Sequence, residues 1–152
     1  METDVVYGTG FIELLKKKRE NNAYPHSGTK RLLTGKKAIV TSGPTHEPLD
    51  PVRYIANRSS GRQGHAIAAA LADHGANTVL ISGPTNLSDP VGVSVHKIGS
   101  ALEMLAACKK ELPADILVCA AAVADWRARQ PAKEKIKRNL SKISSTEVSL
   151  NI

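Results

Sequence analysis

The chain has 152 residues, with 21 Lys and Arg against 14 Asp and Glu, which gives a formal net charge of +7. That length predicts a single domain. The basic balance favours anionic partners, either phosphate-bearing small molecules or nucleic acid. The sequence contains no secretory signal and no apolar run long enough to span a membrane, so we expect a cytoplasmic protein that does not bind membranes.

Residues 1–35 are predicted to form a short helix and a linker. The helix, over residues 4–22, places Phe11, Ile12, Leu14 and Leu15 in one apolar patch. Residues 21–35 are rich in Asn, Pro, Ser, Gly and Thr, a composition typical of linkers. The folded domain is therefore expected to begin at Lys36.

From Lys36 onward the sequence alternates between strand and helix patterns. Strands are predicted over residues 38–42, 78–82, 93–98 and 115–119, and helices over residues 62–74 and 100–112. One Trp, three Tyr and one Phe are the aromatic residues, so the core must be built from Ala, Val, Ile and Leu. This alternation predicts an α/β fold, an incomplete Rossmann-like three-layer sandwich with a mainly parallel sheet covered on both faces.

The two helices carry recognisable boundary residues. Ser59 or Ser60 is predicted to cap the first helix, and Gly75 to end it. Ser100, with Glu103 three residues later, is predicted to cap the second. The buried face of the first helix is expected to hold Gly64, Ile67, Ala68 and Leu71. The buried face of the second is expected to hold Ala101, Leu105, Cys108 and Leu112.

The two cysteines, Cys108 and Cys119, lie in apolar stretches and are predicted to be small buried residues of a reducing compartment. Their spacing fits neither a disulfide scaffold nor a structural zinc site. The carboxylates show no dedicated metal cluster, so no residue is predicted to ligate a metal.

A loop suited to anions follows the first predicted strand. It runs from Thr41 to Gly64 (TSGPTHEPLDPVRYIANRSSGRQG) and leads into a helix N-terminus, where unpaired N–H groups and the helix dipole favour phosphate or carboxylate. Gly43 and Gly61 lack a Cβ, so a ligand can approach the backbone. Arg53 offers a planar pair of donors for an anion. Part of this loop, SGPT, recurs at residues 82–85 and is interpreted as a repeated strand-exit turn.

Two further stretches follow in order. Residues 121–125 (AAVAD) come directly after the fourth predicted strand, with Arg127 close behind. Residues 134–138 (EKIKR) lie within a basic segment, residues 126–142, which is predicted to be a mobile flap. Residues 146–152 alternate like a strand.

These three stretches together resemble the phosphopantothenate–cysteine ligase family, also called phosphopantothenoylcysteine synthetase. The resemblance runs from Lys36 to Ile152 and is to the ligase half of a bacterial bifunctional protein, in which a flavin-dependent decarboxylase half comes first. Family members continue beyond the point that corresponds to Ile152. The domain organisation implied is an N-terminal helix and linker (1–35) and a partial ligase domain (36–152) with a basic flap (126–142).

The resemblance also implies a reaction. Family members join 4′-phosphopantothenate to L-cysteine, using CTP to form an acyl-cytidylate intermediate, with Mg²⁺ held on the triphosphate. They act in coenzyme A biosynthesis as homodimers. Such chemistry depends on positioning and charge neutralisation more than on a protein nucleophile.

The residue roles carry over from the matching motifs. Asn57 and Lys135 are the expected catalytic residues, the first at the acyl-phosphate intermediate and the second at the CTP phosphates. Expected contacts to the substrate phosphate are Gly43, Arg53, Ser59, Ser60 and Gly61. Expected contacts to the nucleotide are Cys119, Ala120, Ala121, Asp125, Lys135 and Lys137. Cys119 stands where Gly is frequent in the family, and Arg138 stands where Lys is usual.

Other interpretations stay open from the sequence. Asn57 could form an Asx turn, Arg53 a surface salt bridge, Asp125 a helix N-cap and the Lys135 region a solvated charge run. His46 and His65 are weak candidates for a general base. A short-chain NAD(P)-dependent oxidoreductase would need a TGxxxGxG loop and a YxxxK pair, which are absent. A nucleic-acid binder would need aromatic residues among the basic ones. A ligase-like chain that binds nucleotide without activity also fits, and ATP in place of CTP is not excluded.

Overall fold

The computed structural model describes residues 31–136 and the backbone of residues 150–151. The predicted helix over residues 4–22 and most of the linker fall outside the described residues, as do Lys137, the second half of the predicted flap and most of the predicted last strand. Within the part that is described, no helix is long and apolar enough to cross a membrane.

A four-stranded parallel sheet forms the centre of the molecule. Its strands are β1 (Lys37–Ser42), β4 (Asn77–Ser82), β5 (Ser94–Lys97) and β6 (Ile116–Cys119). They lie in the order β5-β4-β1-β6, and every pairing is parallel. All four predicted strands are thus confirmed to within a residue or two, and the strand order is that of half a Rossmann fold.

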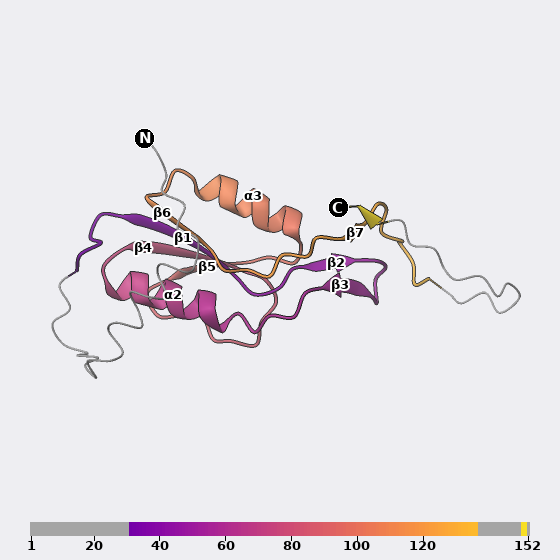
Figure 1. Ribbon diagram of the computed structural model, residues 1–152, viewed down its shortest axis with the longest axis horizontal. Helices are drawn as coiled ribbons and strands as arrows, with labels where there is room; N and C mark the ends of the chain where they lie inside the picture. Colours follow the sequence, from indigo (N-terminus) through magenta and orange to yellow (C-terminus); the bar gives the residue numbers. More distant parts are fainter. Residues whose placement is uncertain (1–30, 137–149, 152) are drawn as a thin grey trace, which may run out of the picture.

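Two helices cover the two faces of the sheet (Figure 1). Against one face, α2 (Arg62–Asp73) packs with a cluster that includes Val40, Leu71 and Leu80. Against the other face, α3 (Ala101–Glu111) packs through Met104 onto Ile39 and Ile81. The aliphatic, aromatic-poor core that the composition requires is confirmed, since every residue of both clusters is aliphatic, Met or Cys.

The predicted first residue and end of α2 are confirmed, whereas its predicted N-cap is wrong. Gly75 has a φ of 95°, and its N–H and that of Ala76 bond back to Ala72 and Leu71, which closes the last turn as a Schellman motif. The N-cap, however, is Gly61, in the left-handed conformation with a φ of 72°. A Cβ at Gly61 would lie 2.7 Å from the Thr85 methyl group, so the chain enters α2 through a turn that only glycine fits.

The start of α3 is as predicted, whereas its buried face is rotated from the predicted one. The Ser100 hydroxyl accepts from the Glu103 N–H at 3.3 Å, and the Glu103 carboxylate accepts from the Gly99 N–H at 2.7 Å. Met104 is the buried residue, while Leu105 is 51% and Leu112 47% exposed. The helix is pinned at its far end because the Glu111 carboxylate pairs with Lys37 at 3.0 Å, and this fixes which side faces the sheet.

The predicted burial of the cysteines is half right. Cys108 is partly buried against the α3 side of the sheet, but Cys119 is exposed. Cys119 ends β6, which is the edge strand of the sheet within the described residues. Within the described residues, no further strand pairs with β6 on its outer side, so Cys119 lies at the edge of the sheet.

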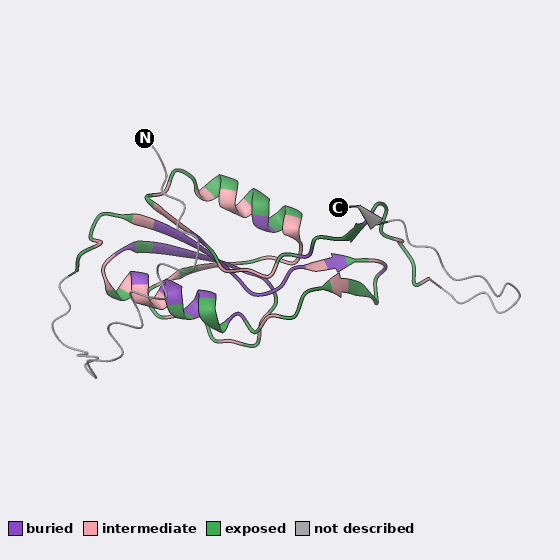
Figure 2. Ribbon diagram, viewed as in Figure 1, coloured by how far each residue is buried: buried purple, intermediate pink, exposed green. Residues whose placement is uncertain are grey.

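Small antiparallel elements extend from one end of the sheet. The hairpin of β2 (His46–Pro48) and β3 (Tyr54–Ala56) projects beyond the carboxyl ends of the parallel strands, and β7 (Arg127–Ala128) pairs with β8 (Leu150–Asn151) beside it (Figure 1). Figure 2 shows that burial is concentrated in the sheet and in the first part of this extension. The hairpin interrupts the segment predicted from the sequence as one continuous loop.

Candidate functional site

The strand order reverses between β1 and β6, and the loops that leave these two strands run side by side. The Ala120 N–H donates to the Thr41 carbonyl at 3.2 Å, and the Ala122 N–H to the Gly43 carbonyl at 2.8 Å. The buried Thr45 hydroxyl then accepts from the Ala124 N–H at 2.9 Å. In open α/β sheets such a reversal point is where ligands bind, so the structure joins the first two sequence motifs at the expected place.

Asn57 makes the contact that links the anion loop to the stretch at residues 121–125. Its Nδ2 donates to the carbonyl oxygen of Val123 at 2.9 Å, and the side chain is otherwise exposed. An amide has two N–H groups and a carbonyl oxygen, so this single bond leaves donor and acceptor capacity that can face a ligand. The Asx turn considered from the sequence is not what this contact shows, because the partner is 66 residues away.

The anion loop enters α2 through its two serines. The Ser59 hydroxyl accepts from the Gly61 N–H at 3.2 Å and the Ser60 hydroxyl from the Arg62 N–H at 3.5 Å. These bonds orient the serine side chains beside the first backbone N–H groups of the helix. Donors of this kind at a helix N-terminus suit a phosphate or carboxylate.

An open hollow of about 590 Å³ lies in front of this loop. Its lining is made of small, polar and basic residues together with one aromatic pair: Pro44, His46, Tyr54, Ala56, Asn57, Arg58, Ser59, Ser60 and Pro84. His46 and Tyr54 form one wall as stacked rings, with centroids 4.0 Å apart and planes 11° apart. One concave surface therefore holds three of the predicted site residues, namely Asn57, Ser59 and Ser60. Arg58 adds a positive charge to this surface.

Arg53 lies at the far end of the hairpin and is bound to Asp50. Its Nε and Nη2 reach the Asp50 Oδ2 at 3.0 and 2.6 Å, and Nη2 also donates to the Ile136 carbonyl at 3.2 Å. The salt bridge considered from the sequence is thus present, with the Asp50 carboxylate completely buried. The predicted role of Arg53 at the substrate phosphate stays a prediction, although these contacts engage most of its guanidinium group.

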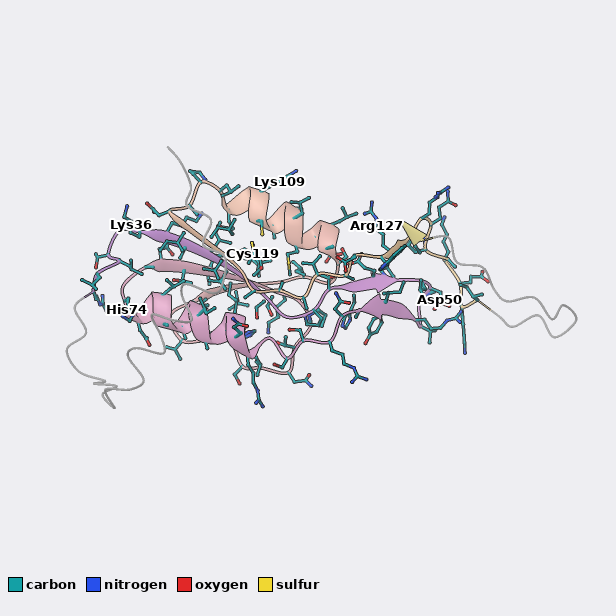
Figure 3. All side chains as sticks on the ribbon, viewed as in Figure 1. Lys36, Asp50, His74, Lys109, Cys119 and Arg127 are labelled. Carbon is teal, nitrogen blue, oxygen red and sulfur yellow. The ribbon has the colours of Figure 1, made fainter. Side chains whose placement is uncertain are left out.

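The expected nucleotide residues lie along the exposed edge of β6 and just beyond it. Cys119 ends the strand, Ala120 and Ala121 continue it, and Asp125 is exposed two residues before β7. Figure 3 places Cys119 beneath α3, at a distance along the molecule from Asp50 at the hairpin. No helix begins at Asp125 in the described part of the chain, so the alternative role as an N-cap is excluded there.

The described half of the predicted flap is fastened to the hairpin. The Ala132 N–H donates to the Leu49 carbonyl at 2.9 Å, and the Ile136 N–H to the Asp50 Oδ2 at 3.1 Å. Lys135 is exposed between these two anchors. Two hydrogen bonds thus join residues 132–136 to the hairpin, one of them to buried Asp50, and the mobile flap expected over residues 126–142 stays a prediction. Lys137 lies outside the described residues.

Asp50 and Glu47 are important residues that the sequence reasoning missed. Asp50 accepts five hydrogen bonds, from the N–H groups of residues 52, 53 and 136 and from the Arg53 side chain. The Arg53 guanidinium, together with these backbone donors, holds the pKa of Asp50 far below its usual range. Buried Glu47 accepts from the Ala101 N–H at 2.8 Å, at the N-terminus of α3. The Asp-Pro turn could have pointed to Asp50 in advance, whereas the contacts of Asp50 with Ile136 and of Glu47 with Ala101 join residues that are distant in sequence.

The chemistry available to this surface is that of binding and orientation. Among the described residues, no group of three or more His, Cys, Asp or Glu side chains could hold a metal ion. What the surface offers is backbone donors, one amide, hydroxyls and Arg58. Sheet order, reversal point and helix placement together define an α/β domain of the Rossmann-like kind.

Comparison with known proteins makes the assignment specific. Residues 33–151 match the family described as the DNA/pantothenate metabolism flavoprotein C-terminal domain, and the chain belongs to this family. It is 51% identical over 121 residues to the coenzyme A biosynthesis bifunctional protein CoaBC of Mycolicibacterium smegmatis, covering 78% of this chain and 29% of that protein. The CoaBC protein of Vibrio cholerae is 48% identical over 110 residues, which cover 72% of this chain and 28% of that protein.

Solved structures agree with this placement. The crystal structure of the C-terminal domain of CoaBC superimposes with a TM-score of 0.63 at 38% identity, over 69% of this chain and 56% of that one. A Cab2 mutant in complex with phosphopantothenate-cysteine gives a TM-score of 0.61 over 97% of this chain and 65% of that one; at 17% identity it shows the fold alone. The chain thus spans less than a third of the bifunctional relatives and about half of the solved domain.

Proposed function

We propose that this chain forms the substrate- and nucleotide-binding core of a phosphopantothenate–cysteine ligase of coenzyme A biosynthesis. The observation that carries the proposal is the Asn57–Val123 contact, which brings the anion loop and the stretch after β6 together at the strand reversal point. The names of the relatives support it, since CoaBC acts in coenzyme A biosynthesis and a Cab2 mutant was solved with phosphopantothenate-cysteine.

The proposed reaction needs an activated carboxylate, because the oxygen of a free carboxylate is a poor leaving group. In the proposed route the carboxylate of 4′-phosphopantothenate attacks the α-phosphorus of CTP and releases pyrophosphate, giving an acyl-cytidylate. The amine of L-cysteine then attacks the acyl carbon, and CMP leaves. The protein has to hold the reactants together and stabilise developing negative charge.

The substrate phosphate is assigned to the hollow in front of α2. Ser59, Ser60 and the backbone at Gly61 supply donors, Gly43 leaves room for close approach, and Arg58 adds charge at the same surface. Asn57 is assigned to the acyl-phosphate group, toward which the second amide hydrogen and the carbonyl oxygen remain available. This arrangement puts the reacting carboxylate beside the loop that follows β6.

The cytidine nucleotide is assigned to the edge of β6. The small residues Ala120 and Ala121, with Cys119, allow a base or ribose to lie against the backbone, and Asp125 offers a carboxylate to nucleotide donors. Lys135 and Lys137 are assigned to the triphosphate. Mg²⁺ would come with the nucleotide, held by phosphate oxygens and water, since the described residues offer no cluster of three protein ligands.

We also propose that the ligase is a homodimer. A second hollow of about 560 Å³ lies between the hairpin and the start of α3. Its rim includes Val52, Tyr54 and Leu102, which are 60%, 55% and 58% exposed, respectively. Large apolar residues gathered at one hollow favour a protein–protein contact.

A second function deserves comparison, namely a ligase-like domain that binds without catalysing. It is favoured by one observation: the groups gathered at the described surface are hydrogen-bond donors and Arg58, which suit binding. Binding and turnover must therefore be measured separately.

Calorimetric titration of the purified chain tests the proposal. With Mg²⁺ present, we expect 4′-phosphopantothenate to bind more tightly than pantothenate, and CTP to bind more tightly than ATP or NADPH. Release of pyrophosphate on mixing CTP with 4′-phosphopantothenate would establish catalysis, and binding without release would support the binding-only function. If neither CTP nor 4′-phosphopantothenate binds at millimolar concentration to the folded chain, the proposal is wrong.

A further inference from the structure

Two buried polar side chains, Ser42 and His65, lie directly behind the anion loop. Ser42 is the last residue of β1 and is fully buried, and His65 is on the first turn of α2 and is 8% exposed. The Ser42 hydroxyl donates to the Gly61 carbonyl oxygen at 2.8 Å. The Nδ1 of His65 lies 3.0 Å from the same oxygen and 3.0 Å from the Ser42 hydroxyl oxygen. Both side chains thus converge on one peptide carbonyl.

The hydrogen-bond network of this cluster favours one placement of the protons. Since a carbonyl oxygen can only accept, a hydrogen bond between Nδ1 and Gly61 uses the tautomer of His65 with its proton on Nδ1, and we assign that tautomer. The Ser42 proton is directed to the same oxygen. His65 is therefore a donor toward Ser42 and Gly61, and it does not serve as a base that would turn Ser42 into a nucleophile. The cluster therefore holds the Gly61 carbonyl in place, and because it is buried it does not contact the substrate.

The group that is held belongs to the N-cap of α2. The Gly61 carbonyl also accepts the first helical hydrogen bond, from the His65 backbone N–H at 3.1 Å. A trans peptide points its C=O and N–H in opposite directions. Fixing the Gly61 carbonyl toward the core therefore turns the N–H of Arg62 outward, to the side where the Ser60 hydroxyl lies 3.5 Å away.

Close packing leaves this arrangement little freedom. A Cβ on Gly64 would come within 2.5 Å of the Ser42 Cβ, so α2 lies directly against the end of β1. Gly61 itself has a φ of 72°, a conformation that glycine adopts without steric cost, and a Cβ there would lie 2.7 Å from the Thr85 methyl group. A carbonyl that accepts several hydrogen bonds also makes the N–H of the same peptide group a stronger donor.

We propose that Ser42 and His65 are positioning residues for the substrate-phosphate site: by holding the Gly61 carbonyl they orient the Arg62 N–H together with the Ser60 hydroxyl that accepts from it, and the Ser60 O–H donates to the bound phosphate. This inference rests on the proposed function, because it concerns the phosphate of that substrate. It assigns a role to two buried residues that do not touch the ligand.

The test compares four variants of the 152-residue chain. Ser42→Ala removes one donor to Gly61, and His65→Phe keeps a ring but removes the other. His65→Asn places an amide N–H close to the position of Nδ1 and serves as the rescue. Ile67→Val, on the same buried face of α2, controls for a general loss of packing. For each, calorimetry gives the ratio of the Kd for pantothenate to the Kd for 4′-phosphopantothenate.

Ser42→Ala and His65→Phe should each lower this ratio roughly three- to tenfold, as expected for one lost hydrogen bond, with the Kd for pantothenate unchanged. His65→Asn should restore most of the ratio, and Ile67→Val should keep it even where the melting temperature falls. If the two variants keep the full ratio, the inference is overturned while the proposed function stands. If the native chain itself does not distinguish the two ligands, the proposed function fails and the inference falls with it.

Discussion

Asn57 combines a structural contact with a position at the proposed reaction. Its single contact, to the Val123 carbonyl at 2.9 Å, joins two loops that both remain exposed. A net hydrogen bond of this kind contributes about 0.5–1.5 kcal/mol to stability. The same amide, aimed at a developing charge, has a larger effect on rate, because removal of one such donor typically costs on the order of 100-fold or more.

We therefore expect Asn57→Ala to slow acyl-cytidylate formation on the order of 100-fold and to lower the melting temperature only slightly. Single-turnover kinetics in a complete ligase carrying this sequence, together with thermal unfolding, measures both. Asn57→Asp is the matched control, since it keeps the shape but removes the donor, and it should lose activity as well. Unchanged turnover with a melting temperature many degrees lower would show that Asn57 is purely structural.

Asp50 should make folding stability depend on pH. The Arg53 guanidinium, with backbone N–H groups, holds the pKa of Asp50 far below its ordinary value. A carboxylate whose pKa is depressed in the folded state stabilises the fold above its unfolded pKa of about 3.9, and this contribution is lost as the pH falls below that value. Asp50→Asn removes the charge at every pH.

The expected result is that Asp50→Asn is less stable than the native chain at pH 7 and that the difference shrinks as the pH falls below about 4. Urea unfolding at a series of pH values measures it. The pKa values of Glu111 and Asp115 are lowered as well, chiefly by hydrogen bonds from the Lys37 side chain and from the Lys37 backbone N–H, respectively. Both carboxylates are present in the native and variant chains, so their contributions to the free energy of unfolding cancel in the comparison. Asp73→Asn, exposed at the end of α2, is the control for loss of one charge. A difference that stays constant down to pH 2 would contradict this account.

The two SGPT turns act as one element. The Gly83 N–H donates to the Ser42 carbonyl at 2.9 Å, which stacks the turn after β4 against the turn after β1. A Cβ at Gly83 would collide with the Pro44 carbonyl, and a Cβ at Gly43 would lie 2.9 Å from the Thr85 methyl group. The second turn thus packs closely against the first.

Gly83→Ala should consequently displace the first turn and destabilise the fold by about 1–3 kcal/mol, the usual cost of overpacking. Gly99→Ala is the matched control, because its Cβ would meet only the flexible Glu103 carboxylate, at 3.4 Å. Chemical denaturation of both variants gives the comparison. Equal stability of the two variants would show that the turns are not packed as tightly as the structure indicates.

The regular elements could be predicted from the sequence, whereas the contacts between them could not. β1 and β4 are runs of β-branched and aliphatic residues, and Gly75 ends α2 through purely local bonds, so pattern alone is sufficient there. The rotation of α3 depends instead on Lys37, which is 74 residues from Glu111. The N-cap of α2 likewise depends on Thr85, on a different loop. Such long-range contacts leave no local signal.

The same division holds for the candidate site. The anion loop, Asn57 and the stretch at residues 121–125 could be chosen from the sequence because each is a compact motif. The hydrogen bonds that join these motifs involve Thr41, Thr45 and Val123. That the motifs lie together could be inferred only from the strand order. The role of Asp50 could not be foreseen, since its partner Ile136 comes 86 residues later in a segment with no periodic pattern.

Across the whole molecule, the hairpin forms a rigid arm that connects the sheet to the basic segment. Glu47 ties its base to α3 through the Ala101 N–H, and Asp50 ties its tip to Ile136 (Figures 1 and 3). Lys135 is thus carried by a segment with backbone anchors at Ala132 and Ile136. The backbone on either side of Lys135 is thus joined to the hairpin, while the lysine itself stays exposed to solvent.

This arm predicts a specific pattern of hydrogen exchange. The amides of Ala132 and Ile136 should be protected in the free chain because both donate hydrogen bonds, that of Ile136 to a buried carboxylate, while the amides of residues 133–135 should exchange quickly. CTP with Mg²⁺ should slow exchange at residues 133–135, since a bound triphosphate orders the exposed lysines, and should leave the centre of α3 unchanged. Asp50→Asn should release Ile136 and weaken CTP binding, whereas Asp73→Asn should do neither. Rapid exchange at both Ala132 and Ile136 without nucleotide would show that the segment is a free flap after all.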